Sequence, residues 1–398
     1  MNFVFISPNF PEAFRMFCTH LKENGVNVLG IGDAPYDMLH PELKSALTEY
    51  YKVDTLENYD QVLRGMGYFT GRYGKMDYVE SNNEYWLEMD AALRTDFNIT
   101  TGLKSDEIIK YKSKKTMKAY FEKAGVPSAR CHVVTTLESA LEFAALVGYP
   151  MVAKPDNGVG ANATYKLKNE DDLRAFFAEE HHTEYLMEEF VSGVVTTYDG
   201  VINSKGEVLF AVSHISPNSI MDMVNEGIAS YYYVDKDMPA ELEKAGKAVL
   251  AAFEVKSRCF HLEFFRLTEA KAGLGEVGDI VALEVNMRPA GGFTPDMINF
   301  SQSVNMYQIF ADMIAFDERR HEYSGPKSYC IYTGRRDSCS YALTQEQLQQ
   351  FAGEHARLFT RMPKALSGPL GDEVCIACYD TMEEMEEYVR ASFAAPQV

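Results

Sequence analysis

The sequence predicts a multidomain protein of mixed α/β and α+β class, and three observations support this. The chain has 398 residues, which is enough for about two to four domains of ordinary size. Near the start, apolar runs alternate with helical patterns, as in a doubly wound α/β domain. From Cys131 onward, many short alternating runs indicate antiparallel sheet. We therefore expect three units, at residues 1–103, 104–310 and 311–398.

The expected elements of the first unit follow one another as strand, helix and strand. An apolar run at 2–7 precedes a helical pattern at 11–24, and a second strand at 26–30 follows Gly25. Further strands are expected at 51–53 and 76–80, and further helices at 59–66 and 84–94. No GxGxxG motif follows the first strand, so the glycines of a dinucleotide-binding turn are missing.

The second and third units have different patterns. A Lys-rich segment at 105–124 predicts one long helix that ends at Gly125, and alternating runs follow it as far as Arg288. In the third unit, strands are expected at 329–333, 356–361 and 373–378, and helices at 345–351 and 381–392. This last pattern predicts a compact α+β end unit.

The charge balance limits the classes of partner. Thirty-eight Lys and Arg against 58 Asp and Glu give a formal net charge of −20, which repels nucleic-acid backbones and anionic membranes. A site for a small anion such as ATP must then gather its cations locally. The start, MNFVFISPNFPEAF, has no basic n-region, and seven cysteines without regular spacing favour reduced thiols. We therefore expect a cytoplasmic protein with neither nucleic-acid nor membrane partners.

The segment 281–288, VALEVNMR, is the most informative one for chemistry. Strand alternation puts Val281, Leu283, Val285 and Met287 on one face and Ala282, Glu284, Asn286 and Arg288 on the other. A carboxylate, an amide and a guanidinium in one line offer ligands for a hard cation and a clamp for phosphate. The alternative is an ordinary half-exposed strand whose polar side faces water.

A second strand, FHLEFF at 260–265, carries His261 and Glu263 on one face. A carboxylate among so many apolar groups needs a partner, and a divalent cation is one. Glu263 and Glu284 on neighbouring strands are then expected to hold Mg²⁺ with a nucleoside triphosphate. The alternative is that Glu263 simply pairs with a Lys or an Arg.

A third segment, YPMVAKPDNGVGANA at 149–163, has a short strand that delivers Lys154 into a loop with Gly158 and Gly160. Glycines allow the backbone to approach phosphates closely, and the lysine supplies a positive charge. The GKS or GKT of a Walker A sequence is missing, and a plain turn is the alternative.

The order of these pieces resembles the ATP-grasp superfamily. In chain order they are Lys114, Lys154, the stretch MEEFV at 187–191, Glu263, and Glu284 with Asn286 and Arg288. HLEFF and NMRPAGG together are similar to carboxylate-amine ligases of the L-amino-acid ligase type. The resemblance covers about 104–310 and implies an ATP-grasp fold there, with a lid subdomain at about 115–190. The α/β unit before it is similar to the preceding domain common in that superfamily.

The resemblance implies a nucleotide site. Lys114 and Lys154 are similar to the two nucleotide-contacting lysines, and Gly158 and Gly160 lie in the implied loop over the phosphates. MEEFV is similar to the hinge that binds adenine through backbone groups around Glu189 and Val191, with Glu188 nearby. The neighbouring lysines, Lys110, Lys112, Lys115 and Lys118, are expected to form mostly a solvated helix face.

The resemblance also implies a reaction centre. Glu263, Glu284 and Asn286 are the implied ligands of Mg²⁺, with Mn²⁺ as an alternative ion, and Arg288 is the implied catalytic residue. His261 and the turn at Gly291 and Gly292 are candidate substrate contacts. Structural roles for the histidine and for the turn are the alternatives.

Two departures from relatives change the expectations. Many relatives carry a ribose-binding Glu where this chain has Val195, and Asp199 is a candidate substitute. Biotin carboxylases have a similar layout, but they follow the catalytic Arg with a QVEH-like sequence and use a Lys ahead of the metal strands. Here Arg288 leads into Pro-Ala-Gly-Gly, and the segment 211–217, AVSHISP, has no Lys. Attack by an amine is therefore favoured over bicarbonate chemistry.

The implied activity is an ATP- and Mg²⁺-dependent ligase that joins the carboxylate of a small molecule to an amine through an acyl phosphate. Amino acids are the expected substrates, ADP and phosphate are the expected products, and a homodimer is one expected state. The alternatives are a carboxylase-like or carboxylate-phosphorylating enzyme and a catalytically silent ATP sensor.

Overall fold

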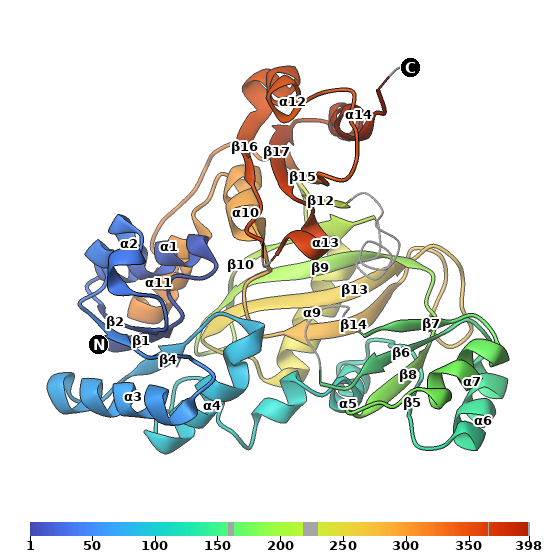
Figure 1. Ribbon diagram of the computed structural model, residues 1–398, viewed down its shortest axis with the longest axis horizontal. Helices are drawn as coiled ribbons and strands as arrows, with labels where there is room; N and C mark the ends of the chain where they lie inside the picture. The colour runs from blue at the N-terminus through green and yellow to red at the C-terminus, as the bar shows by residue number, and fades with distance from the viewer. Residues whose placement is uncertain (158–162, 218–229, 365, 397–398) are drawn as a thin grey trace.

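The computed structural model describes residues 1–157, 163–217, 230–364 and 366–396. Within these residues the strands form three sheets. Figure 1 shows a parallel sheet of the N-terminal part (blue) and a small antiparallel sheet (green) on either side of a large sheet, whose last strands (red) rise away from both. None of the helices in these ranges is long and apolar enough to cross a membrane.

The N-terminal sheet is parallel and covered on both faces. Its strands are β1 (Asn2–Ile6), β2 (Asn27–Gly32), β3 (Glu49–Lys52) and β4 (Tyr78–Glu80), in the order β3-β2-β1-β4. On β1, Phe3 and Phe5 pack with α1 (Arg15–Glu23), whereas Val4 and Ile6 pack with α3 (Tyr59–Tyr73). The helices α2 (Pro41–Ala46) and α4 (Leu87–Asp96) complete this part. The predicted doubly wound arrangement is confirmed.

The small antiparallel sheet has two different faces, one apolar and one charged. Its strands are β5 (Cys131–Val133), β8 (Tyr185–Glu189), β6 (Met151–Pro155) and β7 (Tyr165–Leu167), in that order across the sheet. The helices α6 (Leu137–Val147) and α7 (Glu170–Ala178) pack on Met151 and Ala153. Because side chains alternate along a strand, Lys154 of β6 points to the opposite face.

The large sheet has nine strands in the described part of the chain, in the order β14-β13-β9-β11-β12-β15-β17-β16, with β10 paired to β9. They are β9 (Gly193–Ile202), β10 (Val208–Val212), β11 (His214–Ser216), β12 (Ser230–Val234), β13 (Arg258–Leu267), β14 (Ile280–Asn286), β15 (Tyr329–Arg335), β16 (Ala356–Arg361) and β17 (Glu373–Tyr379). The helices along it are α9 (Ala240–Phe253), α10 (Thr294–Gln302), α11 (Met306–Phe316), α12 (Gln345–Ala352), α13 (Ser367–Leu370) and α14 (Met382–Phe393).

The two faces of β9 and β13 are different. Tyr198 and Leu262 face α9 and belong to an apolar cluster with Phe253. Val201 and Cys259, on the opposite face, pack in the cluster that contains α10 and α11. Further along that second face, alternation brings up polar side chains instead of apolar ones. This change from apolar to polar marks the beginning of the candidate site.

The predicted long helix at 105–124 is wrong, because the segment is broken. A 3₁₀ helix, η4 (Ile108–Tyr111), is followed by a separate helix, α5 (Lys114–Ala124). The Ser113 hydroxyl accepts a hydrogen bond from the backbone N–H of Thr116 at 3.1 Å, which caps the second helix. Tyr111 is buried, and its hydroxyl donates to the carbonyl of Phe253 at 2.7 Å. This contact fixes η4 against the end of α9. The break makes Lys114 the first residue of α5.

The predicted alternation at 281–288 holds for Glu284 onward and is wrong before it. Glu263 pairs with Glu284, but Phe264 pairs with Ala282, so Leu283 is an extra residue in a β-bulge. Ala282 therefore packs in the apolar cluster beneath α9, and Val281 packs in a different one.

The large sheet joins strands of the second and third expected units. β12 pairs with β15 from Ser230↔Gly334 to Val234↔Cys330, and the expected limit at 310 falls within α11. The three-unit division stays a prediction. Within the third unit, β16 has the predicted bounds, and the other predicted strands and helices are present with ends shifted by one or two residues.

Two glycines inside helices test the packing of α9 on β9. A Cβ at Gly246 of α9 would lie 2.3 Å from the Tyr198 ring, whereas a Cβ at Gly67 of α3 meets no atom within 4 Å. Gly246→Ala is expected to lower the free energy of unfolding by about 1–3 kcal/mol through overpacking. Gly67→Ala is expected to raise it by about 0.5–1 kcal/mol through helix propensity. Urea titrations measure both, and changes of the same sign would contradict the expected packing.

Candidate active site

The second face of the small sheet, opposite α6 and α7, carries a cluster of two lysines and one carboxylate. Lys154 Nζ of β6 lies 2.6 Å from Glu188 Oε2 of β8, and Lys118 Nζ of α5 lies 2.5 Å from Glu188 Oε1. Burial alone would raise the pKa of Glu188, but these two ammonium groups outweigh it and hold that pKa down at about 2. Glu188 is therefore ionised at neutral pH and holds both lysines in place.

The N-terminus of α5 is attached to the end of β6. The backbone N–H of Lys114 donates to the carbonyl of Asp156 at 3.2 Å, and that of Lys115 donates to Asp156 Oδ1 at 2.8 Å. Lys114 Nζ then reaches Glu284 Oε1 on the large sheet at 3.0 Å. Burial alone would lower the pKa of Lys114, but Glu284 outweighs this effect and raises it. This lysine therefore connects the two sheets and remains charged.

Glu263 and Glu284 lie directly opposite each other on β13 and β14, as the sequence predicts. Like charges at opposed positions repel, so this pair needs cations. On one side Lys114 contacts Glu284, and on the other His261 Nε2 lies 3.0 Å from Glu263 Oε1. Asn286 follows on the same face of β14, opposite His261, and is buried. Two carboxylates and an amide oxygen form a donor set that fits Mg²⁺.

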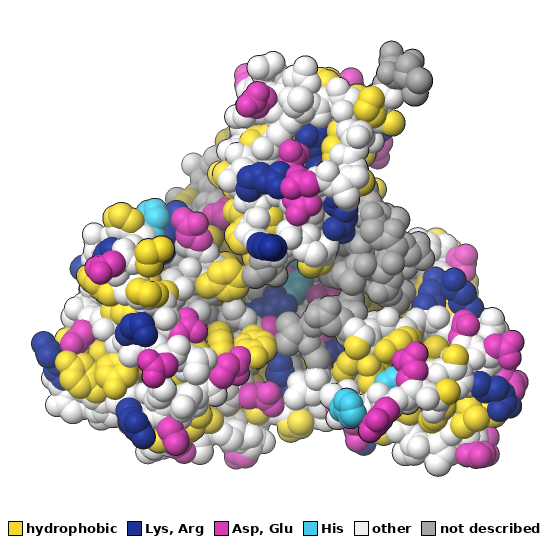
Figure 2. All heavy atoms as spheres, viewed as in Figure 1, with side chains coloured by type: hydrophobic (Ala, Val, Ile, Leu, Met, Phe, Trp, Pro, Cys, Tyr) yellow, Lys and Arg dark blue, Asp and Glu magenta, His cyan; other side chains and the backbone are white. Residues whose placement is uncertain are grey.

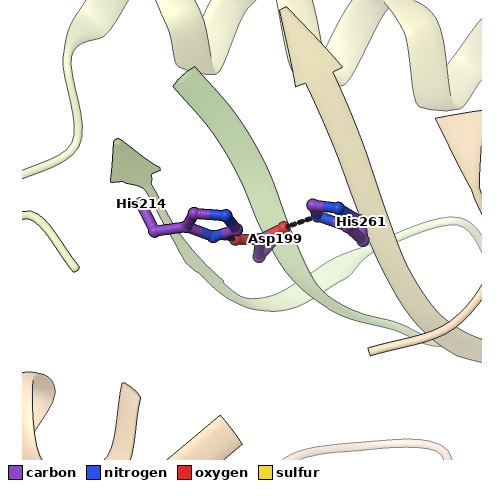
Figure 3. Close-up of side chains that lie close together, drawn as sticks. All are labelled: Asp199, His214 and His261. Carbon is purple, nitrogen blue, oxygen red and sulfur yellow. Dashed lines mark hydrogen bonds and ion pairs between the residues drawn. The ribbon is translucent and has the colours of Figure 1, made fainter. Parts of the chain in front are cut away.

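His261 belongs to a second buried cluster with Asp199 and His214, from three neighbouring strands (Figure 3). Asp199 Oδ1 accepts from His261 Nδ1 at 2.6 Å, and Asp199 Oδ2 accepts from His214 Nδ1 at 2.7 Å. The two imidazole rings stack with centroids 5.5 Å apart. Thr197 completes the set by donating to Asp199 Oδ2 at 2.6 Å. The cluster fixes the ring of His261 from its Nδ1 side.

The charges of this cluster compensate one another. Burial alone would raise the pKa of Asp199, but the two histidines outweigh it and hold that pKa far below its usual range. Burial alone would lower the pKa of His261, but Asp199 and Glu263 outweigh it and raise that pKa to about 9. A doubly protonated His261 donates from both ring nitrogens, to Asp199 and to Glu263. The side-chain nitrogen and oxygen atoms of Asp199, His214 and His261 that could bind a metal lie within 4.8 Å of one another. The hydrogen bonds among these side chains account for this spacing.

Arg288 follows β14 and turns toward the N-terminal sheet. Its Nη1 donates to the carbonyl of Pro289 at 3.0 Å, and its Nε lies 3.5 Å from Glu84 Oε2. Glu84 begins the 3₁₀ helix η3 (Glu84–Trp86), which comes soon after β4. Its other oxygen, Oε1, accepts from Lys112 Nζ at 2.9 Å. Charged side chains that follow β4 and β14 therefore meet Lys112 in one region. Figure 2 shows a hollow with Lys and Arg side chains near the middle of the molecule.

No family model matches the sequence. Over 84 residues the chain is 36% identical to the carbamoyl phosphate synthase large chain of Pseudarthrobacter chlorophenolicus, an alignment that covers 20% of this chain and only 8% of that protein. Over 319 residues it is 21% identical to the L-arginine-specific L-amino acid ligase of Bacillus subtilis, which covers 77% of this chain and 74% of the relative.

Solved structures match nearly the whole chain. The L-amino acid ligase from Bacillus licheniformis has a TM-score of 0.71 at 15% identity, covering 100% of this chain and 99% of that one. The biotin carboxylase domain of the Hydrogenobacter thermophilus 2-oxoglutarate carboxylase, a dimer with MgADP, ADP and bicarbonate, has a TM-score of 0.70 at 14% identity, covering 98% and 89%. The chain has the ATP-grasp fold.

Within this ATP-grasp fold, several expected site residues come together. Lys114 contacts Glu284, Glu284 faces Glu263, and Lys154 lies beside Glu188. Gly158 and Gly160 lie outside the described residues. The turn at Gly291 and Gly292 lies between Arg288 and α10, where Gly292 has a φ of +61° that favours glycine and sits beside Leu370.

Glu189 and Val191 mark the segment between the two antiparallel sheets. Alternation turns the Glu189 side chain to the opposite face from Glu188, where Arg130 Nη2 binds it at 2.6 Å. Val191 is buried with Leu267 and Val281, and Lys271 donates to the carbonyl of Phe190. The side chains of this expected hinge are therefore held by other protein groups. Only its backbone groups are candidates for hydrogen bonds to adenine.

Asp199 as a ribose contact stays a prediction; it is buried and both its oxygens accept hydrogen bonds from histidines. One expectation about the neighbouring lysines is wrong. The lysines around Lys114 are not mainly a solvated face. Lys110 and Lys112 are buried, and Lys118 binds Glu188, whereas Lys115 is exposed. The sequence could have indicated Lys118, because it lies four residues after Lys114 and so shares its face of the helix. It gives no such indication for Glu84, because Glu84 lies 204 positions before Arg288 (288 minus 84).

The ion pairs of Glu188 predict a specific acid sensitivity. Its pKa falls from 4.5 to about 2 on folding, so the pairs stabilise the fold above pH 4.5 and this contribution is lost as the pH falls toward 2. The loss amounts to about 3 kcal/mol at most. Urea titrations across this pH range are expected to show a shallower slope for Glu188→Gln than for the unmodified protein. The exposed Glu170→Gln is the matched control, and equal slopes in all three proteins would contradict the role of the pairs.

Proposed function

We propose that this protein is an ATP- and Mg²⁺-dependent carboxylate–amine ligase that forms an amide bond through an acyl phosphate and releases ADP and phosphate. The observation that carries the proposal is the opposed pair Glu263 and Glu284, with Lys114 beside it. A protein with a net charge of −20 has buried positive charges here, around two facing carboxylates. That combination suits a polyphosphate bound through a divalent cation.

The nucleotide has a natural set of partners. Lys154 and Lys114 are the proposed phosphate contacts, and Lys118 holds Glu188 between itself and Lys154. Gly158 and Gly160 are the proposed backbone contacts of the phosphates. The segment from Glu189 to Val191, with Glu188 nearby, is the proposed adenine site. Because the lysines are already paired with carboxylates, a nucleotide exchanges one set of ion pairs for another.

Glu263, Glu284 and Asn286 are the proposed ligands of Mg²⁺, with Mn²⁺ as an alternative. Held there, the ion would supply charge neutralisation to the phosphates. His261 restrains Glu263 through Oε1, and Oε2 would stay available as a ligand. Asp199 in turn restrains His261, which makes the carboxylate rigid.

The proposed reaction has two displacements. A substrate carboxylate oxygen attacks the terminal phosphorus of ATP, the bond to the bridging oxygen breaks, and ADP leaves. The amine nitrogen then attacks the acyl carbon, phosphate leaves with the former carboxylate oxygen, and the nitrogen loses a proton. Arg288 is the proposed catalytic residue, because its guanidinium offsets negative charge on the phosphoryl group and on the tetrahedral intermediate. Positioning of the two substrates supplies much of the remaining acceleration.

Amino acids are the proposed substrates for both positions. The relatives named as amino-acid ligases support this. His261 and the turn at Gly291 and Gly292 are the proposed substrate contacts. A carboxylase-like activity is the second candidate, because the biotin carboxylase domain matches the fold almost equally well. A cytoplasmic location, a homodimer and the three-unit division remain predictions.

Phosphate release tests the proposal directly. ATP and Mg²⁺ are supplied with amino acids, singly and in pairs, with and without bicarbonate, and active mixtures are analysed by mass. The expected result is release that depends on one carboxylate and one amine, with a product at the summed mass minus water. Release that needs bicarbonate instead supports the carboxylase, and AMP with pyrophosphate contradicts both. Nucleotide binding without any release supports the sensor.

Two variants separate chemistry from metal binding. Arg288→Ala is expected to lower kcat by about 100-fold or more while the affinity for ATP changes little, because its charge acts mainly on the transition state. Glu284→Gln is expected to raise the Mg²⁺ concentration needed for half-maximal rate by about tenfold, because one anionic ligand is lost. Steady-state kinetics across Mg²⁺ concentrations measures both. An equal loss of folding stability in the two variants would indicate structural roles instead.

A further inference from the structure

Glu84 is a buried carboxylate that the proposed reaction has not yet used. It comes from the N-terminal part of the chain, in η3, and is 6% exposed. Its side chain nevertheless reaches residues of the ATP-grasp part, Lys112 and Arg288. A buried charge of this kind is costly unless its oxygens are well paired.

The two oxygens of Glu84 have unequal partners. Lys112 Nζ donates to Oε1 at 2.9 Å and lies 3.3 Å from the backbone carbonyl of the same residue, so the carboxylate is held in one orientation. Oε2 is buried and accepts no hydrogen bond from any described residue. Arg288 Nε lies 3.5 Å from this oxygen, which is beyond a good hydrogen bond. An unpaired buried oxygen costs about 1–3 kcal/mol, so a small approach of Arg288 is favourable.

The contacts of Arg288 show what this approach does. Nη1 is already held by the carbonyl of Pro289 at 3.0 Å. With Nε held by Glu84, two of the three guanidinium nitrogens are anchored to protein oxygens. Nη2 has no hydrogen-bond or ion-pair partner among the described residues and carries two N–H donors. A planar guanidinium fixed at two corners presents the third in a defined direction.

We propose that Glu84 is a positioning residue for Arg288. Its Oε2 accepts a hydrogen bond from Arg288 Nε during turnover and so directs Nη2 toward the phosphoryl group and the acyl oxygen. Lys112 fixes Glu84 for this task from the opposite oxygen. The N-terminal α/β part is therefore a component of the reaction centre. The inference rests on the proposed ligase function and adds a residue to it.

A double-mutant cycle tests whether Glu84 acts through Arg288. The four proteins are the unmodified chain, Glu84→Gln, Arg288→Lys and the double variant, and the readouts are kcat and KM for ATP. Lysine keeps the charge but lacks Nε, so it cannot make the proposed contact. We expect Glu84→Gln to lower kcat by about tenfold or more with little change in KM, and to have less than about a twofold effect in the Arg288→Lys background.

Matched controls separate this role from a general structural one. Glu88→Gln, four residues further on and exposed, is expected to leave kcat unchanged. Trp86, the single tryptophan of the chain, lies in η3 itself, so its emission reports whether the helix keeps its environment. Equal effects of Glu84→Gln in both backgrounds, or an unchanged kcat, would overturn the inference. Absence of phosphate release from the unmodified protein with every substrate would instead overturn the proposed function, and this inference with it.

Discussion

The opposition of Glu263 and Glu284 on β13 and β14 is the constraint on which the rest of the site depends. Hydrogen bonding of the sheet fixes the two residues directly opposite each other, so the backbone cannot move them apart to relieve the repulsion. Positively charged groups lie close to each carboxylate and offset this repulsion. Lys114 approaches from α5, and His261 approaches along β13 with Asp199 behind it. A divalent cation between the carboxylates completes the same balance in the proposed working state.

The charged side chains that serve this centre come from different parts of the chain. Lys154 is presented by a small sheet and Lys114 by the capped start of a helix, whereas Glu84 extends from the end of the parallel sheet. Each is buried and already paired with an opposite charge. The site is therefore largely organised before any ligand arrives, which lowers the reorganisation that a transition state requires.

Local periodicity explains which features the sequence predicts well. The alternation on β13 and β14 identifies Glu263, Glu284 and Asn286 as one polar face, and the bounds of β16 are predicted to the residue. Features set by distant contacts are missed. The bulge at Leu283 depends on pairing with β13, the break before α5 depends on Tyr111 reaching Phe253, and the contact of Glu84 with Arg288 joins residues with no local signal. Roles of the site residues come from resemblance and remain proposals.

The central claim is that a carboxylate is phosphorylated at this pair of acidic residues and then transferred to an amine. Isotope transfer tests it most directly. A substrate with both carboxylate oxygens labelled by a heavy isotope is turned over with ATP and an amine, and the mass of the released phosphate is measured by mass spectrometry. The account predicts one labelled oxygen in each phosphate, because the acyl phosphate breaks between carbon and that oxygen. Unlabelled phosphate during amide formation would contradict it.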